Sequence, residues 1–417
     1  MSGRILLVAA LLSAAPAAAG ADTIDATATT LLAGRQDPRD GTVHTVVPFY
    51  ETLSLQASDL RNPWFSDTRI VVAAWGLLQA GDPLDGTTGT GDVDLAYVEG
   101  RTAGRRLTLR AGRQLVFGGA ARALQLDGLD ARARLVDGVG VEVYGGMPTT
   151  PRFASDQGDA VAGGRLFYRP SPRLEAGASF VHVLGQGRTE RQEAGFDLRV
   201  APAPVLTIAV LSLFSTVEER LAEAALQAIW QPLRTVELTL EAARTAPDLL
   251  IPRGSIFSVF AEQTRDEAGG VLYLRPLTRL RLVVDGHAID DDSGLGGRAG
   301  ARASLALGRD HATTLGAELR LLELPTKGLL DARTFAVRRL TERLVTTLEL
   351  SADWLDPAVN GQDRSLTGVA TLGWDFAPGW RGVVTGVAGE TPLLERRLEI
   401  LAKLVYQATL RVREVRP

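Results

Sequence analysis

Polar and apolar side chains alternate along most of this chain, and this pattern limits the possible folds more than any other feature of the sequence. Between Arg279 and Ala288, apolar residues at even positions alternate with mostly polar residues at odd positions. The segments Thr235–Ala243 and Leu344–Trp354 show the same pattern. Because successive side chains of a strand point to opposite faces of a sheet, each segment predicts a strand with one apolar and one polar face.

Short turn signals divide the chain, most of them at intervals of about 31 to 37 residues, enough for two strands and a loop. They stand at residues 99–106, 135–140, 169–173, 201–204, 231–234, 275–278, 308–311, 340–343 and 377–380. Longer, more polar segments lie between them, at Gly81–Asp92, Gly146–Asp159, Asp290–Gly297 and Asp356–Asp363. This alternation is typical of hairpins with short periplasmic turns and longer extracellular loops.

Two strands per interval give about 22 strands, with both chain ends on the short-turn side. Even numbers from 16 to 22 stay open for two reasons. The interval from Gln231 to Arg275 is too long for two strands, and Leu221–Trp230 is rich enough in alanine to form a helix instead.

Three features favour a membrane over water as the solvent of the apolar faces. The strands are long enough to cross a bilayer at a tilt, and the polar faces carry many full charges. Four tryptophans, Trp64, Trp230, Trp354 and Trp380, lie near predicted strand ends, where interfacial aromatic girdles form. An open sheet edge cannot exist in lipid, so the sheet must close. The predicted fold is therefore all-β, a closed antiparallel transmembrane β-barrel. An exported soluble protein with several β-sheets is the alternative.

The N-terminus predicts export. Arg4 precedes a short apolar run and a small-residue segment ending in Ala19-Gly20-Ala21, as in a secretory signal peptide. We therefore expect a signal peptide at 1–21 and a single barrel domain at 22–417. Cleavage would remove one arginine and no acid, so the net charge would change from −4 to −5. That charge does not favour nucleic acid as a partner, and the absence of cysteine excludes disulfides and thiolate chemistry.

One stretch carries a family resemblance. The run "LTLRAGRQLVFGGAARALQLDGLDARARL" at Leu107–Leu135, continued by "VGVEVYGG" at Val139–Gly146, resembles porin-like outer-membrane β-barrels of Gram-negative bacteria. It is similar in style to alginate-export-type and related porins, in which a "GRQ" strand, a Gly-rich loop and a "DGL" strand recur. The resemblance implies a transport channel in the outer membrane. The chain departs from it by ending in "LVYQATLRVREVRP", without the usual terminal aromatic residue.

The sequence offers little catalytic chemistry. Its four histidines are far apart, and neither H-E-x-x-H nor G-x-S-x-G occurs. His287, two residues after Asp285, is the one candidate for a barrel hydrolase, and a polar pair facing the lumen is the simpler interpretation. Asp290, Asp291 and Asp292 lack the spacing of a calcium loop, so a solvated acidic tip is expected there. We expect no enzyme activity, no cofactor and no metal.

The predicted function is a porin-like channel for passive diffusion of small hydrophilic solutes or ions. The alternative is a non-conducting barrel that anchors an envelope-spanning motility or secretion complex. No large N-terminal plug domain is expected, although Gly81–Asp92 or Thr245–Ile256 could fold inward. Besides outer-membrane lipid and solutes, a second copy of the chain or periplasmic proteins are candidate partners. The solute, ion selectivity, gating and oligomeric state stay open. The residues predicted to line the pore are Arg106, Arg110, Arg132, Arg134, Glu237, Glu241, Arg279, Arg281, Asp285, Arg298, Arg302, Glu349 and Asp353.

Overall fold

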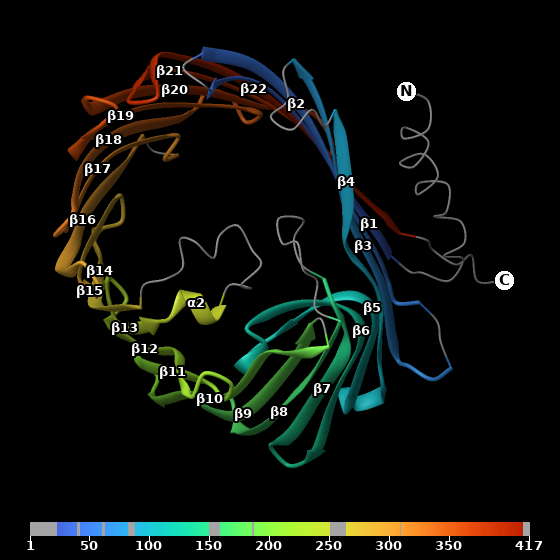
Figure 1. Cartoon of the computed structure of the whole chain (residues 1–417). Helices are drawn as coiled ribbons and strands as arrows, with labels where there is room; N and C mark the ends of the chain where they lie inside the picture. The colour runs from blue at the N-terminus through green and yellow to red at the C-terminus, as the bar shows by residue number, and fades with distance from the viewer. Residues whose placement is uncertain are drawn as a thin grey trace.

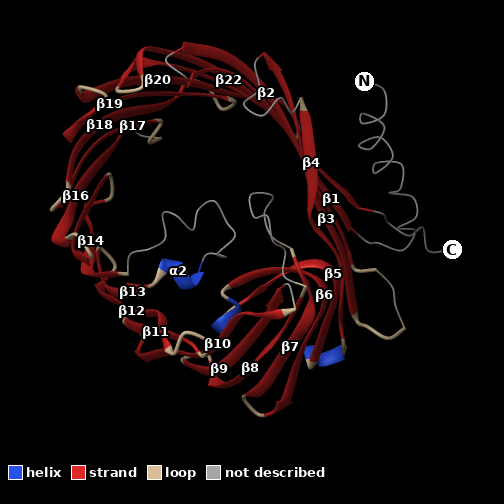
Figure 2. Cartoon of the chain, in the orientation of Figure 1, coloured by secondary structure: helices blue, strands red, loops and turns tan. Residues whose placement is uncertain are grey.

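A computed structural model describes residues 23–39, 42–60, 63–81, 88–149, 159–185, 187–250, 264–308 and 310–411. Within these ranges, 22 strands form one antiparallel sheet that closes on itself (Figures 1 and 2). Each strand pairs with its neighbours in sequence, and β1 pairs with β22, from Thr23 opposite Arg411 to Gly34 opposite Ile400. The expected signal peptide at 1–21 lies outside the described residues.

The strands of the first half of the barrel are β1 (Thr23–Arg39), β2 (Thr42–Ser58), β3 (Asp67–Gly81), β4 (Gly89–Arg101), β5 (Leu107–Phe117), β6 (Ala123–Val136), β7 (Val139–Pro148), β8 (Ala160–Ser171), β9 (Leu174–Gly185), β10 (Arg188–Ala203) and β11 (Leu206–Ser215). Those of the second half are β12 (Arg220–Leu233), β13 (Val236–Thr245), β14 (Arg265–Leu277), β15 (Leu280–Asp291), β16 (Gly294–Leu307), β17 (Thr313–Leu324), β18 (Lys327–Arg339), β19 (Leu344–Val359), β20 (Gln362–Ala377), β21 (Trp380–Thr391) and β22 (Leu394–Arg411). The described ranges also contain three short helical turns: η2 (Ala103–Arg105), η3 (Gly119–Ala121) and α2 (Pro247–Leu250).

Closure is what makes this sheet compatible with lipid. In a closed barrel every strand has a hydrogen-bonding neighbour on both sides, so no edge leaves backbone N–H and C=O groups unsatisfied in a hydrocarbon solvent. The predicted closed antiparallel barrel of about 22 strands is confirmed. No helix in the described part of the chain is long and apolar enough to cross a membrane.

The two ends of the barrel differ. We call the end where Thr23 and Arg411 meet the terminal end, and the opposite end the distal end. All nine predicted short turns lie at the terminal end, among them Asp137–Gly138 between β6 and β7 and Pro378–Gly379 between β20 and β21.

Two of the predicted distal loops are shorter than expected. Strands continue through most of Asp290–Gly297 and Asp356–Asp363, leaving two-residue turns at Asp292–Ser293 and Asn360–Gly361. Asn360 and Gly361 have φ values of 52° and 78°, and two successive positive φ values are what a tight type I′ hairpin requires. Polar residues in these segments therefore mark strand ends and tight turns, where we had predicted loops.

The alanine-rich segment Leu221–Trp230 is a strand, and the helical alternative is wrong. Within β12, Leu226 lies opposite Val210 of β11 and Ala242 of β13. Pairing on both sides satisfies its backbone polar groups. This outweighs the helix propensity of alanine, because propensity is a weak determinant compared with tertiary contacts. The long interval between Gln231 and Arg275 instead contains α2, which Figure 1 shows inside the ring of strands.

The barrel wall has an apolar outer face. In β17, Leu315, Leu319 and Leu321 are exposed on one face, while Glu318 on the other is buried. The same alternation appears in β19, where Leu348 and Leu350 are exposed outward. Apolar side chains can face lipid without a free-energy penalty, whereas the polar side chains between them point into the interior of the barrel.

Three of the predicted interfacial tryptophans lie near the terminal end. Trp230 ends the outer face of β12, Trp380 begins β21, and Trp64 lies in the β2–β3 connection; all are exposed, as is Trp354 farther along β19. Trp380 also belongs to an aromatic cluster, with ring centroids 6.1 Å from Phe376 and 4.4 Å from Tyr406. Aromatic rings at the level of the headgroups stabilise a membrane protein's position in the bilayer.

Candidate pore lumen

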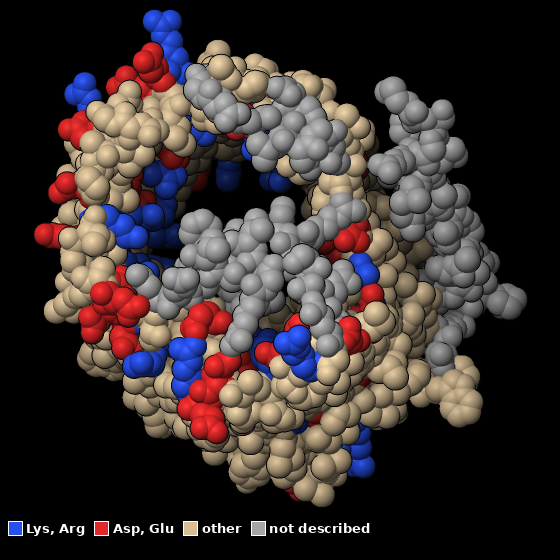
Figure 3. Space-filling view, in the orientation of Figure 1, with Lys and Arg blue, Asp and Glu red and all other residues tan. Residues whose placement is uncertain are grey.

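The inner surface of the barrel is divided into two dissimilar parts. We call the inward face of β4–β11 the filled wall and that of β16–β22 the open wall. Among the described residues, more than half of the buried apolar side chains belong to the filled wall and its turns, whereas only Leu324 and Leu394 belong to the open wall. The space-filling view is hollow beside β16–β22, with Lys and Arg side chains at the edge of the hollow (Figure 3).

The β5–β6 turn folds onto the inner side of the filled wall. Its short helix η3 contacts β9, β10 and β11. The Ala120 N–H donates a hydrogen bond to Ser179 Oγ at 2.8 Å, and Arg191 Nη2 donates to the Ala120 carbonyl at 2.8 Å. Gly119 permits this approach, because a Cβ there would lie 2.3 Å from Ser179 Oγ.

Arg122 fastens the same turn. Its Nη1 lies 2.7 Å from Glu193 Oε2, and its Nε lies 2.6 Å from Glu223 Oε2. Glu193 is 1% exposed and also accepts from Arg191 at 2.9 Å. The φ of Arg122 is 54°, a backbone strain of order 1–3 kcal/mol that surrounding contacts must offset. We call Gly118–Arg122 with these contacts the latch.

An apolar cluster lies beneath the latch. Leu126, Leu213 and Val181 are fully buried in it, although inward-facing residues of a wide barrel ordinarily meet water. The cluster also contains Val116, Ala120, Ala121, Tyr144, Val161 and Val183. Side chains therefore fill this part of the lumen.

Toward the terminal end, ion pairs fill the wall. Glu99 is 1% exposed and is held by Arg101 at 2.6 Å, Arg110 at 2.6 Å and Arg69 at 2.9 Å. Arg165, on β8, binds Asp197 at 2.5 Å and Glu175 at 2.8 Å. Charges that satisfy one another in this way are no longer available to a solute.

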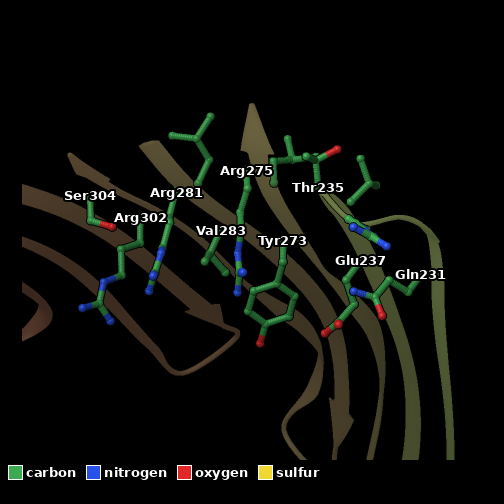
Figure 4. A pocket seen from close by; sticks show the side chains of 13 residues that line it. Gln231, Thr235, Glu237, Tyr273, Arg275, Arg281, Val283, Arg302 and Ser304 are labelled. Atoms are coloured by element: carbon green, nitrogen blue, oxygen red, sulfur yellow. The ribbon is translucent and has the colours of Figure 1, made fainter. Parts of the chain in front are cut away.

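A different arrangement occupies the terminal ends of β12–β16. A cavity of about 460 Å³ is lined there by Arg234, Arg275, Arg281 and Arg302, and Glu237 is the one acidic residue among the described residues of its lining. Tyr273, Gln231, Thr235 and Ser304 contribute polar groups to it. Figure 4 shows Arg275, Arg281 and Arg302 side by side, each extending to the same side of the ribbon as Tyr273. We call this the arginine pocket.

The predicted pore residues are spread over both walls, the arginine pocket and the strands between the walls. Arg110 belongs to the Glu99 cluster, and the Arg132 guanidinium lies 4.7 Å from the centre of the Phe167 ring. Three of them, Glu237, Arg281 and Arg302, line the arginine pocket. The positions of the others are as follows: Arg106 follows η2 in the β4–β5 turn, Arg134 is exposed on β6, Arg279 is exposed in the β14–β15 turn, and Asp285 lies opposite Gly300.

The remaining predicted residues lie near ionisable side chains that are one or two strands away. Glu241 lies 3.6 Å from His287 Nε2, and Arg298 binds Glu267 at 2.7 Å. Glu349 binds Arg333 at 2.5 Å, and Asp353 lies opposite Asp331. Only part of the predicted set therefore presents charge that no other side chain satisfies.

Sequence reasoning missed several important residues. Arg234 and Arg275 fell inside the turn signals at 231–234 and 275–278, although Arg275 continues the inward alternation of Tyr273. Arg122 lies in a turn, where alternation predicts nothing. Glu99 fell inside the turn signal at 99–106, and the burial of both Glu99 and Glu193 depends on arginines far away in sequence.

In the described residues, neither ring nitrogen of His287 has a hydrogen-bond partner, and the Glu241 carboxylate lies 3.6 Å from Nε2, outside hydrogen-bond distance. No group of three or more His, Asp or Glu side chains capable of holding a metal ion occurs in the same part of the chain.

Comparison with solved structures finds barrels of similar fold. The translocation pore of the P pilus usher PapC is 8% identical, with a TM-score of 0.57 over 93% of this chain and 100% of that one. The Escherichia coli P pilus tip assembly intermediate PapC-PapD-PapK-PapG gives 8% and 0.55, over 94% and 61%. A BenF-like porin from Pseudomonas fluorescens gives 9% and 0.48, over 93% and 99%. Similarity at this level concerns the fold. No protein-family model and no curated protein sequence matches the chain.

Proposed function

We propose that this chain is an outer-membrane channel of a Gram-negative bacterium through which small hydrophilic solutes or ions diffuse passively, without catalysis or cofactor. The terminal end, with its short turns and both described chain ends, faces the periplasm in this proposal. The pore-lining role proposed for the predicted residues is to set the electric field of the lumen.

The observation that supports the proposal best is the open wall itself. Many of its inward positions are charged or polar, and the space-filling view is hollow beside it (Figure 3), whereas the filled wall is closed by packed side chains. A large barrel with a polar, incompletely filled interior is the architecture of an aqueous channel. Charged groups around such a channel select solutes by field and size.

Cysteine labelling during conductance recording provides a direct test, because the native chain has no cysteine. Thr347 and Leu348 are neighbours on β19 that point to opposite faces, and Leu348 is 56% exposed on the outer face. A charged, membrane-impermeant thiol reagent should lower the single-channel current of Thr347→Cys. It should leave Leu348→Cys unchanged.

A second control is Val181→Cys, which places the thiol in the apolar cluster, where the native side chain is 0% exposed. No modification is expected there. A folded barrel that never conducts in a planar bilayer would overturn the channel proposal and support the alternative of a non-conducting anchor for an envelope-spanning complex.

A further inference from the structure

The arginine pocket has a charge balance unlike the rest of the lumen. Arg234, Arg275, Arg281 and Arg302 line it together with one carboxylate, Glu237. In the part of the chain that the structure describes, no Asp or Glu lies within ion-pair distance of any of these four guanidinium groups. Among the same described residues, Glu237 has no cationic partner within that distance. The lining therefore carries a local charge of about +3, since arginine stays protonated at neutral pH.

An acidic residue lies next to the pocket, but it is paired with arginines outside the pocket. Glu318 lies directly opposite Arg302 across β16 and β17, yet it is bound by Arg320 and lies 3.6 Å from Arg333. Arg302 instead lies over the Phe335 ring, with its guanidinium 5.1 Å from the ring centre. The positive charge of the pocket is therefore left uncompensated within the protein.

The strand register keeps these like charges close. Leu274 lies opposite Leu282, which makes Arg275 and Arg281 the adjoining residues on β14 and β15 toward the turn. Arg281 in turn lies opposite Ser304, and Val283 lies opposite Arg302. Like charges facing each other across strands destabilise a sheet. An anion bound between these guanidinium groups would therefore offset their repulsion.

We propose that the arginine pocket is a binding site for a small oxyanion, a phosphate or a carboxylate compound, at the terminal end of the lumen. The guanidinium fork matches the geometry of both groups, which it can bind through two parallel hydrogen bonds. Tyr273 and Ser304 provide hydroxyl donors, and a volume of about 460 Å³ accommodates a small molecule. In the proposed channel, such an anion would bind here next to the periplasm.

The test is equilibrium dialysis of the detergent-folded, full-length protein against radiolabelled inorganic phosphate or malonate at constant ionic strength. It does not require conduction, so it can succeed or fail independently of the channel proposal. Saturable binding of either probe is expected. Tighter binding of phosphate or of malonate then decides which oxyanion class the pocket prefers.

The key variant is Arg275→Gln/Arg281→Gln, which should weaken binding at least tenfold. Its matched control is Arg199→Gln/Arg339→Gln, which removes two positive charges near the terminal ends of β10 and β18, outside the pocket. The control should change affinity less than twofold. Arg275→Lys/Arg281→Lys keeps the charge without the fork and should give an intermediate affinity.

Two results would overturn the proposal. One is the absence of saturable binding of both probes to a barrel with native heat-modifiable mobility. The other is an equal loss of affinity in the pocket variant and in its control, because that would mean that only the general positive field attracts the anion.

Discussion

The filled wall and the open wall consist of the same kind of strand, yet the side chains on their inner faces differ in burial and in ion pairing. On β4–β11, inward charges such as Glu99 and Glu193 are buried and held by several arginines. On β16–β22, most inward side chains are partly exposed, and the like-charged Asp331 and Asp353 face each other across β18 and β19. Alternation therefore determines which side chains point inward. Their contacts with other side chains determine whether they are buried within the lumen or remain exposed on its surface.

The largest expected difference between the two walls concerns a single arginine on each. Arg122 and Arg333 each bind two glutamates, but the first holds the latch and the second lies on the open wall. Arg122→Glu places a third carboxylate beside the fully buried Glu193, so we expect a loss of about 3–5 kcal/mol in unfolding free energy. Arg333 is partly exposed to solvent, so we expect Arg333→Glu to lower the unfolding free energy by only about 1 kcal/mol.

Denaturant titration of the folded barrel in detergent measures both losses. The Arg122→Glu barrel should also conduct more current than the native one, because the released turn no longer covers the filled wall. Equal losses of stability in the two variants would show that the walls do not differ in the way proposed.

Removal of an inward leucine should reveal the same contrast with a smaller effect. Leu213→Ala deletes a fully buried side chain from the apolar cluster, which costs about 2–5 kcal/mol when the cavity cannot collapse. Leu401→Ala changes a half-buried position on β22 and should cost less than about 1 kcal/mol. The same titration decides; a larger loss at Leu401 would contradict the division into walls.

The smallest expected effect concerns ion selectivity. Lys403 is exposed on β22, whereas Arg132 lies on the filled wall over Phe167. Charge reversal by Lys403→Glu should therefore shift the reversal potential in a salt gradient toward cation preference more than Arg132→Glu does. If Arg132→Glu gives the larger shift, then the current passes along the filled wall.

Much of the architecture was predictable because it depends on local rules. Alternation within segments such as Arg279–Ala288 gave the inner and outer faces, and the spacing of turn signals gave the strand count. The intolerance of lipid for unpaired backbone groups then required closure. The helical alternative for Leu221–Trp230 arose because propensity is local, whereas the hydrogen bonds that decide the matter come from β11 and β13.

The candidate sites were predictable only in part. Arg281, Arg302 and Glu237 were expected in the lumen from alternation, but nothing in the sequence indicated that they would share a cavity with Arg234 and Arg275. The latch was not predictable, since Arg122 meets Glu193 and Glu223 across 71 and 101 residues of chain.

The sequence alone is enough to predict a closed barrel, because the period-two alternation and the apolar face of each strand are visible within single strands and their turns. Only the tertiary structure decided which arginines are satisfied by carboxylates and which are left to an anion. The physical reason is that an ion pair depends on distances of a few ångströms between strands, and those distances exist only after the sheet has closed.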